Sequence, residues 1–211
     1  DSMHTPHGRS IPVATGIKLF RPDLNVVVFG GDGDIVGIGL SHFIHAARRN
    51  VDVLVIMVNN MVYGMTGGQV APTTPFKART TTTPYGSFEE PLDAAALAVA
   101  ADACYVSRWT TVHQNELRES IKKAMNMQGF RFIEVVSQCP TAFGRRAGFK
   151  DVSEMLKGFK ENSVTTEQAE KLSKDALTQK IVVGEFIQKQ RKTLIENVHD
   201  TIREAQEVEE D

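Results

Sequence analysis

The chain has 211 residues, with 24 lysines and arginines against 26 aspartates and glutamates, and 41% of it is hydrophobic. This near-neutral charge argues against a general polyanion binder, so we do not expect a nucleic-acid partner. The composition is typical of a globular protein. No uncharged apolar run approaches the ~18 residues that span a bilayer, and residues 1–11 lack the basic and apolar blocks of a signal peptide. We therefore expect a cytoplasmic protein without membrane contact.

Residues 25–59 predict a strand, a helix and a second strand. Residues 25–30 form a continuous apolar run that ends in glycine, which is typical of a strand buried on both faces. Residues 35–49 carry apolar side chains at mostly helical spacing, and residues 51–59 form a second buried apolar run. Because a unit of this kind strongly favours a right-handed parallel crossover, we expect a parallel sheet.

The rest of the chain continues the alternation of helices and strands. Residues 60–91 are rich in Gly, Thr and Pro, and such a long segment is rarely an idle connection, so we expect this loop to be functional. Further elements are predicted by periodicity and by turn residues: helices at 92–101, 115–128, 152–160 and 166–178, strands at 105–109, 131–137 and 180–186, and a charged C-terminal helix to about residue 208.

This order predicts an α/β fold with a doubly wound, mainly parallel sheet and helices on both faces. We expect residues 1–150 to form the main α/β domain. Residues 151–211 are expected to form a helical C-terminal extension with one added strand, either as part of the same domain or as an interface segment.

Glycines and polar residues follow both of the first two strands. The sequence Gly-Asp-Gly-Asp at residues 31–34 follows the first strand, and Asn-Asn at residues 59–60 ends the second. Parallel strands end at one edge of a sheet, which is where open α/β sheets bind ligands. Gly31 and Gly33 permit tight turning, and the backbone amides that open the next helix suit a phosphate.

A carboxylate beside an anion site indicates that a cation lies between the two. Mg²⁺ prefers oxygen ligands in an octahedron shared with phosphate oxygens. Asp32 is the natural first ligand, the side-chain carbonyl of Asn60 the second, and the backbone carbonyl of Val62 the third. A structural alternative exists for each feature, because Gly-Asp-Gly is a common turn, Asp34 can cap the helix that begins at Ile35, and Asn-Asn is frequent in loops.

Together these residues resemble the thiamine diphosphate and Mg²⁺ motif of thiamine enzymes. Over about residues 3–190, the chain resembles the β subunit of 2-oxoacid:ferredoxin oxidoreductases, especially the 2-oxoglutarate type. The strings that carry this resemblance are HGR at 7–9, ATGIK at 14–18, GGDGDIVGIGLSHFIHAARRN at 30–50, NNMVYGMTGGQVAPTTP at 59–75 and SQCPT at 137–141.

The resemblance implies a thiamine diphosphate-binding fold and a role for each matching residue. Asp32, Asn60 and the Val62 carbonyl are implied as Mg²⁺ ligands. His7 is implied to lie beside the cofactor and Met65 to approach the substrate; the alternative for His7 is an exposed histidine at a helix start. The other positions implied near the cofactor are Gly31, Gly33, Asp34, Gly64 and Thr66.

The implied reaction is oxidative decarboxylation of a 2-oxoacid with CoA, giving acyl-CoA and CO₂ and passing electrons to ferredoxin. The family places the catalytic glutamate of thiamine activation on an α subunit, so we expect an obligate heterodimer that is inactive without its partner. Its β subunit begins with a Cys-x-x-Cys pair and a further cysteine, which join a later cysteine to hold a [4Fe-4S] cluster. This chain begins after them, so we expect a preceding segment.

Cys139 is the position that resembles the later cluster ligand, and it would be the single cluster ligand in this chain. A lone cysteine is otherwise more often a small buried hydrophobe, and we expect this of Cys104. Two alternative functions stay open. A non-oxidative thiamine decarboxylase or synthase subunit would share Asp32 and Asn60 without a cluster, and a non-catalytic phosphate-binding module would use residues 31–34 only as a helix start.

Overall fold

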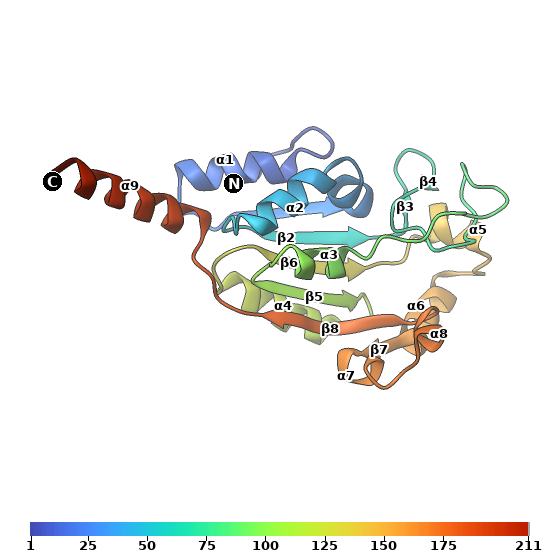
Figure 1. Ribbon diagram of the computed structural model, residues 1–211. Coiled ribbons are helices and arrows are strands. Elements are labelled where there is room, and N and C mark those ends of the chain that lie inside the picture. The colour runs from blue at the N-terminus through green and yellow to red at the C-terminus, as the bar shows by residue number, and fades with distance from the viewer. Residues whose placement is uncertain (211) are drawn as a thin grey trace.

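The computed structural model describes residues 1–210, with side chains for residues 1–207. Its centre is a six-stranded sheet in the order β1-β2-β6-β5-β8-β7 (Figure 1). The first four strands in this order run parallel, and β8 runs antiparallel to β5. The strands are β1 (Val27–Gly31), β2 (Leu54–Asn59), β6 (Arg131–Val136), β5 (Tyr105–Thr110), β8 (Ile181–Gln188) and β7 (Ser163–Thr165). The expected mainly parallel α/β sheet is confirmed.

Helices cover both faces of this sheet, as expected. On one face, α1 (Ser10–Phe20), α2 (Leu40–Arg48) and α3 (Ala94–Ala100) pack on β1, β2 and β6 around Phe43 and Phe132, whose rings lie 4.9 Å apart. On the other face, α4 (Gln114–Met125) packs on β5 and β6. The continuous apolar run of β2 is buried at almost every position, as expected for a strand covered on both faces. The same expectation is wrong for β1, because β1 is an edge strand and leaves Val27 and Phe29 exposed.

The first crossover differs from the single helix predicted over residues 35–49. A π-helical turn, η1 (Gly33–Ile38), precedes α2, and the backbone leaves helical geometry at Gly37 (φ −88°, ψ −107°). A Cβ atom at Gly37 would lie 2.5 Å from the Tyr63 hydroxyl, so the interruption occurs where a distant side chain packs on the turn. Periodicity alone carries no information about that contact.

The C-terminal part also differs in detail. The helix predicted over 166–178 is two short helices, α7 (Thr166–Ala169) and α8 (Lys174–Leu177), because Ser173 caps the second with its hydroxyl. The segment contributes two strands, β7 and β8, where one was predicted. The remaining elements of this region are η2 (Pro140–Gly144), α5 (Arg145–Ala147), α6 (Val152–Asn162) and α9 (Leu194–Glu210).

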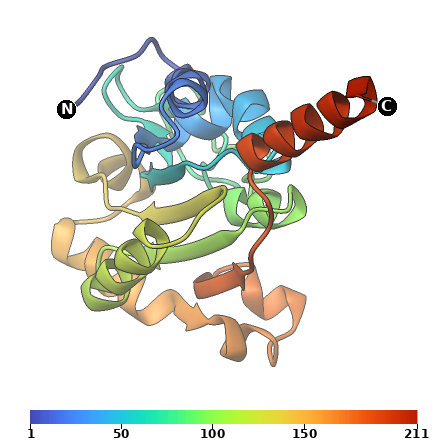
Figure 2. The same ribbon diagram turned by 90° about the vertical axis from the view of Figure 1, so that its left-hand side faces the viewer.

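The last helix, α9, projects away from the body of the molecule, as both ribbon views show (Figures 1 and 2). Within residues 1–210, no helix has the length and apolar character needed to cross a membrane. The division of the chain at residue 150 stays a prediction.

Candidate functional site

Three neighbouring strands end at one edge of the sheet. Gly31 at the end of β1 pairs with Val58 in β2, and Asn59 at the end of β2 pairs with Val136 in β6. The turns that follow these strands therefore start side by side, and they carry Asp32, Asn60 and Cys139 respectively. Figure 1 shows the hairpin of β3 (Val62–Tyr63) and β4 (Gln69–Val70) and the short helix α5 at this end of the sheet.

Asp32 is 2% exposed, although its side chain is a carboxylate. Burial raises the pKa of Asp32, against hydrogen bonds from the Thr73 hydroxyl and from the backbone amides of Gly33 and Met61, which lower it. Among the described side chains, no lysine, arginine or histidine forms an ion pair with it. A buried carboxylate without a counterion is costly, and a bound cation would supply the missing positive charge.

The turn after β2 holds a strained backbone beside this carboxylate. Met61 has φ of +68°, which is uncommon for a residue other than glycine. Its amide donates to the Asn59 side-chain oxygen at 3.1 Å, and its carbonyl accepts from the Thr74 hydroxyl at 2.6 Å. The Asn60 side-chain oxygen accepts a long, 3.3 Å bond from the Val62 amide. These contacts fix the backbone of the Asn60 turn, which starts beside the turn that carries Asp32.

Tyr63 is a residue of this site that the sequence did not single out. A Cβ atom on Gly33 would lie 2.1 Å from the Tyr63 ring, so only glycine allows the ring to pack on this turn. The hydroxyl donates to the Gly33 carbonyl at 3.3 Å. Burial raises the pKa of the Tyr63 phenol, and the charges of Asp32 and Asp34 add to this effect. In the sequence, Tyr63 stands out only because it follows the predicted ligand Val62, and this position does not show where its ring packs.

Asp34 does not cap the helix that follows it, so that alternative is wrong. Its carboxylate instead accepts from the backbone amide of Gly8 at 2.6 Å and from the Ser10 hydroxyl at 3.3 Å, and it lies 2.7 Å from His7 Nδ1. The His7 ring also packs edge-on against Tyr63, with ring centres 6.1 Å apart. The structure therefore brings His7, which is 26 positions away from Gly33 in the sequence, onto the same turn.

We expect Asp34→Ala to loosen the segment of residues 7–10 while the sheet stays folded. The variant removes both the acceptor of the Gly8 amide and the carboxylate that contacts the His7 ring. Hydrogen exchange followed by mass spectrometry should show exchange at least tenfold faster in this segment, with β2 and β6 unchanged as the internal control. Unaltered exchange at residues 7–10 would contradict this role of Asp34.

The hairpin tip carries the remaining predicted positions. Met65 is fully exposed, and Thr66 is exposed with its hydroxyl bonded to Gln69 at 2.8 Å. Gly64 lies between two other site residues, because a Cβ atom there would be 3.4 Å from Asn60 Nδ2 and 3.6 Å from Cys139 Sγ. The structure thus places Cys139, a half-buried free thiol, next to the Asn60 turn, whereas Cys104 is fully buried in the core.

The turns at this edge of the sheet carry a set of oxygen donors that could hold a divalent cation. It consists of one carboxylate, one amide oxygen and one backbone carbonyl oxygen, and hard oxygen donors of this kind suit Mg²⁺. Among the side chains of residues 1–207, no group of three or more His, Cys, Asp or Glu could hold a metal ion.

Comparisons with known proteins extend this picture. Residues 1–135 match the family model of the thiamine pyrophosphate enzyme, C-terminal TPP binding domain. The chain is 53% identical to 2-oxoglutarate synthase subunit KorB of Methanocaldococcus jannaschii, over 96% of this chain and 75% of that one. It is 44% identical to the 2-oxoacid:ferredoxin oxidoreductase subunit beta of Saccharolobus solfataricus, over 66% of this chain and 46% of that one.

A comparison with solved structures also finds a similar oxidoreductase chain. The chain is similar to a chain of 2-oxoglutarate:ferredoxin oxidoreductase from Magnetococcus marinus, solved with 2-oxoglutarate, coenzyme A and succinyl-CoA bound. The TM-score is 0.79 at 32% sequence identity, and the match covers 94% of this chain and 68% of that chain. The agreement extends beyond residue 135, so it includes part of the C-terminal segment as well.

Proposed function

The chain belongs to the thiamine pyrophosphate enzymes, among the β subunits of 2-oxoglutarate synthases and 2-oxoacid:ferredoxin oxidoreductases, and on this premise we propose that it forms the cofactor-binding half of a 2-oxoacid oxidoreductase. The proposed reaction is oxidative decarboxylation of 2-oxoglutarate with CoA to succinyl-CoA and CO₂, with electrons passed to ferredoxin. The observation that carries the proposal is the buried carboxylate of Asp32 beside the Asn60 turn, at the edge where β1 and β2 end.

In this proposal, Asp32, Asn60 and the Val62 carbonyl hold Mg²⁺, and the cation holds the diphosphate of thiamine diphosphate. The backbone of Gly31, Gly33 and Asp34 and the hairpin residues Gly64 and Thr66 surround that diphosphate. When bound, the cofactor supplies the electron sink that decarboxylation requires. The chain's own contribution is charge balance at Asp32 and a rigid turn at Met61, which keep the oxygen ligands in place before the cation binds.

His7 and Met65 are the proposed contacts to the reacting molecules. Asp34 holds His7 at Nδ1, which leaves Nε2 as the ring nitrogen available for a hydrogen bond to substrate or cofactor. Met65 presents an exposed apolar side chain at the hairpin tip, where it can contact the carbon chain of a 2-oxoacid. His7 contacts Tyr63, and Met65 follows Gly64, which lies beside Asn60, so both residues come from segments that adjoin the proposed metal ligands.

Cys139 is the proposed contribution of this chain to a [4Fe-4S] cluster. Its sulfur lies beside Gly64 in the hairpin after the Asn60 turn, so a cluster there would be near the diphosphate. Pro140 follows it directly and starts the turn η2, which limits the conformations available to this thiol. Clusters of this type normally require four thiolates, so the other three would come from outside the described residues.

The test is reconstitution with the α subunit, which we propose supplies the glutamate of thiamine activation. We expect 2-oxoglutarate-dependent reduction of ferredoxin or of a viologen dye by the full-length β subunit together with α, and none above background by β alone. Omitting CoA from the complete mixture should also suppress turnover. Full activity of the β subunit alone would contradict the half-site, and absence of any 2-oxoacid-dependent reduction by the complex would contradict the function.

A further inference from the structure

A chain of buried polar side chains runs beneath the proposed metal site. The Asn59 amide donates to Glu134 Oε1 at 2.8 Å, and Arg108 Nε donates to Glu134 Oε2 at 2.7 Å. Arg108 also pairs with Asp93, the residue that caps α3. We call Asn59, Glu134 and Arg108 the buried polar chain. It crosses three adjacent strands, β2, β6 and β5, on the face that packs against α3.

Burying charged side chains in this way costs folding free energy, so their presence requires an explanation. Glu134 is 2% exposed, and it lies on the same face of β6 as the apolar core residue Phe132. Burial lowers the pKa of Arg108, but the charges of Glu134 and Asp93 outweigh it and raise the pKa overall, so Arg108 keeps its positive charge. Replacing a buried ion pair by apolar residues is often neutral or stabilising. Stability alone therefore does not explain a charged pair in the middle of this sheet.

The geometry of Asn59 provides the reason. An asparagine amide has an oxygen that accepts and a nitrogen that donates, and the two can exchange places by rotation. Since the Glu134 carboxylate only accepts, it fixes the nitrogen of Asn59 on its own side and aims the oxygen at the Met61 amide. Arg108 occupies the second oxygen of Glu134 and prevents that carboxylate from turning away.

The bond from Asn59 to Met61 is the link to the metal site. It holds Met61 at φ of +68°, a strained conformation for a residue other than glycine. Met61 lies between Asn60 and Val62, so its backbone direction sets where the Asn60 amide and the Val62 carbonyl point. One hydrogen-bonded residue thus adjoins two of the three proposed ligands.

We propose that Asn59 and Glu134 are positioning residues of the divalent-cation site, with Arg108 as the partner that holds Glu134. The proposal rests on the proposed function, since it assumes that Asp32, Asn60 and Val62 bind the cation. It predicts that two substitutions disturb these hydrogen bonds in different ways. Asn59→Ala removes the acceptor of the Met61 amide and leaves the Glu134 and Arg108 ion pair intact. Glu134→Gln keeps the volume, but one side of the new amide then faces a donor, either Arg108 or Asn59.

The experiment measures cation binding directly in the purified complex of β with α. Calorimetric titration of Mg²⁺ in saturating thiamine diphosphate should give affinities about 10- to 100-fold weaker for Asn59→Ala and for Glu134→Gln than for the parent, the range usual for residues that orient metal ligands. With Mn²⁺ as the probe, the electron paramagnetic resonance spectrum of the bound ion should change in both variants. The double variant should bind no more than about threefold weaker than the weaker single variant.

Glu185→Gln is the matched control. Glu185 is also an ion-paired glutamate of the same sheet, 2.6 Å from Lys123 and bonded to the Tyr105 hydroxyl at 2.9 Å, but it lies on β8. We expect its Mg²⁺ affinity and Mn²⁺ spectrum to equal those of the parent. If Glu134→Gln fails to fold, Asn59→Ala still tests the proposal, because this variant keeps the ion pair between Glu134 and Arg108.

The outcomes separate the two proposals. A parent complex that binds neither Mg²⁺ nor thiamine diphosphate contradicts the proposed function. A parent that binds both, together with folded Asn59→Ala and Glu134→Gln variants that bind Mg²⁺ within threefold of it, overturns the positioning role. A loss of melting temperature without a change of Mg²⁺ affinity or of the Mn²⁺ spectrum would also overturn it, since that result describes a purely structural pair.

Discussion

Replacing Asp32 by asparagine is expected to abolish the stabilisation by thiamine diphosphate plus Mg²⁺ and to leave the ligand-free protein at least as stable as the parent. Burial raises the pKa of Asp32, so the folded state binds this proton more tightly than the unfolded state does. The charged carboxylate therefore lowers the stability of the ligand-free protein as the pH rises. The neutral amide avoids this cost and can still accept from the Thr73 hydroxyl. It lacks the negative charge that a divalent cation requires, so the cation and the diphosphate lose their first ligand.

Thermal unfolding of the complex with and without ligand measures this effect. At a ligand concentration of about 100 times Kd, the parent should gain about 2.7 kcal/mol, roughly 5–10 °C in Tm for a chain of this size. Asp32→Asn should show no shift, and Asp23→Asn, a matched change in an exposed aspartate, should keep the full shift. ATP or NAD with Mg²⁺ serves as a second control, because equal stabilisation by them would favour a general phosphate-binding module instead.

A ligand-dependent shift that persists in Asp32→Asn would remove this residue from the site. It would leave the family assignment standing, because that assignment depends on 53% identity to a known 2-oxoglutarate synthase subunit and on a fold match with a TM-score of 0.79. The variant therefore tests the ligand assignment at a single carboxylate, whereas reconstitution with the α subunit tests the activity of the whole enzyme.

The parts of the fold that the sequence predicted are those that depend on local patterns. Continuous apolar runs identify both β1 and β2 as strands, although only β2 is buried on both faces, and the parallel register then brings the ends of the two strands to one edge. The juxtaposition of the Asp32 and Asn60 turns follows from these two facts without any knowledge of side-chain contacts. The predicted membership of the 2-oxoacid oxidoreductase family is likewise confirmed.

What the sequence did not predict depends on contacts between distant residues. Tyr63 packs on Gly33 across 30 positions, and Glu134 bonds Asn59 across 75. No periodicity encodes such pairs, because many polar and aromatic residues would fit the same pattern equally well. The alternative role of Asp34 as a helix cap was wrong for the same reason, since its carboxylate bonds the backbone of Gly8 instead.

Asn50 illustrates how a local prediction can be right and incomplete. The first crossover helix ends at Arg48, close to the predicted end at residue 49, and Asn50 then has φ of +53°. Its side chain is fully buried and donates to the carbonyls of Arg191 and Lys192, while its oxygen accepts from the Phe130 amide. It therefore joins the segment just before α9 to the core, a contact that is visible only in the folded chain.

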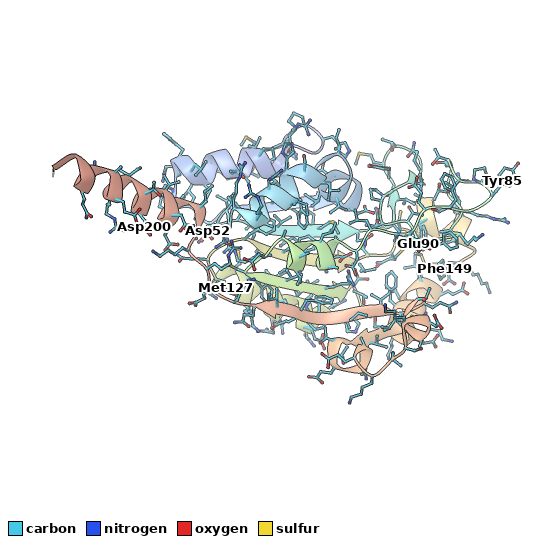
Figure 3. All side chains as sticks on the ribbon, viewed as in Figure 1. Asp52, Tyr85, Glu90, Met127, Phe149 and Asp200 are labelled. Carbon is cyan, nitrogen blue, oxygen red and sulfur yellow. The ribbon has the colours of Figure 1, made fainter. Side chains whose placement is uncertain are left out.

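The largest effect on stability is expected at the edge of the sheet opposite to the site. Asp52 lies 2.7 Å from Lys18 Nζ and 2.8 Å from Arg131 Nη2, and all three side chains are at most 13% exposed. Figure 3 shows Asp52 and Met127 at one end of the molecule and Tyr85 and Phe149 at the other. Burial lowers the pKa of Arg131, and the charge of Asp52 opposes that shift. One carboxylate thus compensates two buried cations.

Asp52→Ala should therefore lower the free energy of unfolding by about 3–5 kcal/mol, because it leaves two buried cations without a counterion and the Gly129 amide without its acceptor. This corresponds to a fall of roughly 10 °C in Tm, measured by urea and thermal unfolding of the ligand-free protein. Asp23→Ala, the same change at an exposed ion pair, should leave Tm unaltered. A decrease below about 1 kcal/mol for Asp52→Ala would contradict this account. It would mean that the carbonyls of Pro22 and Leu24, which already accept from Lys18, satisfy this ammonium group without Asp52.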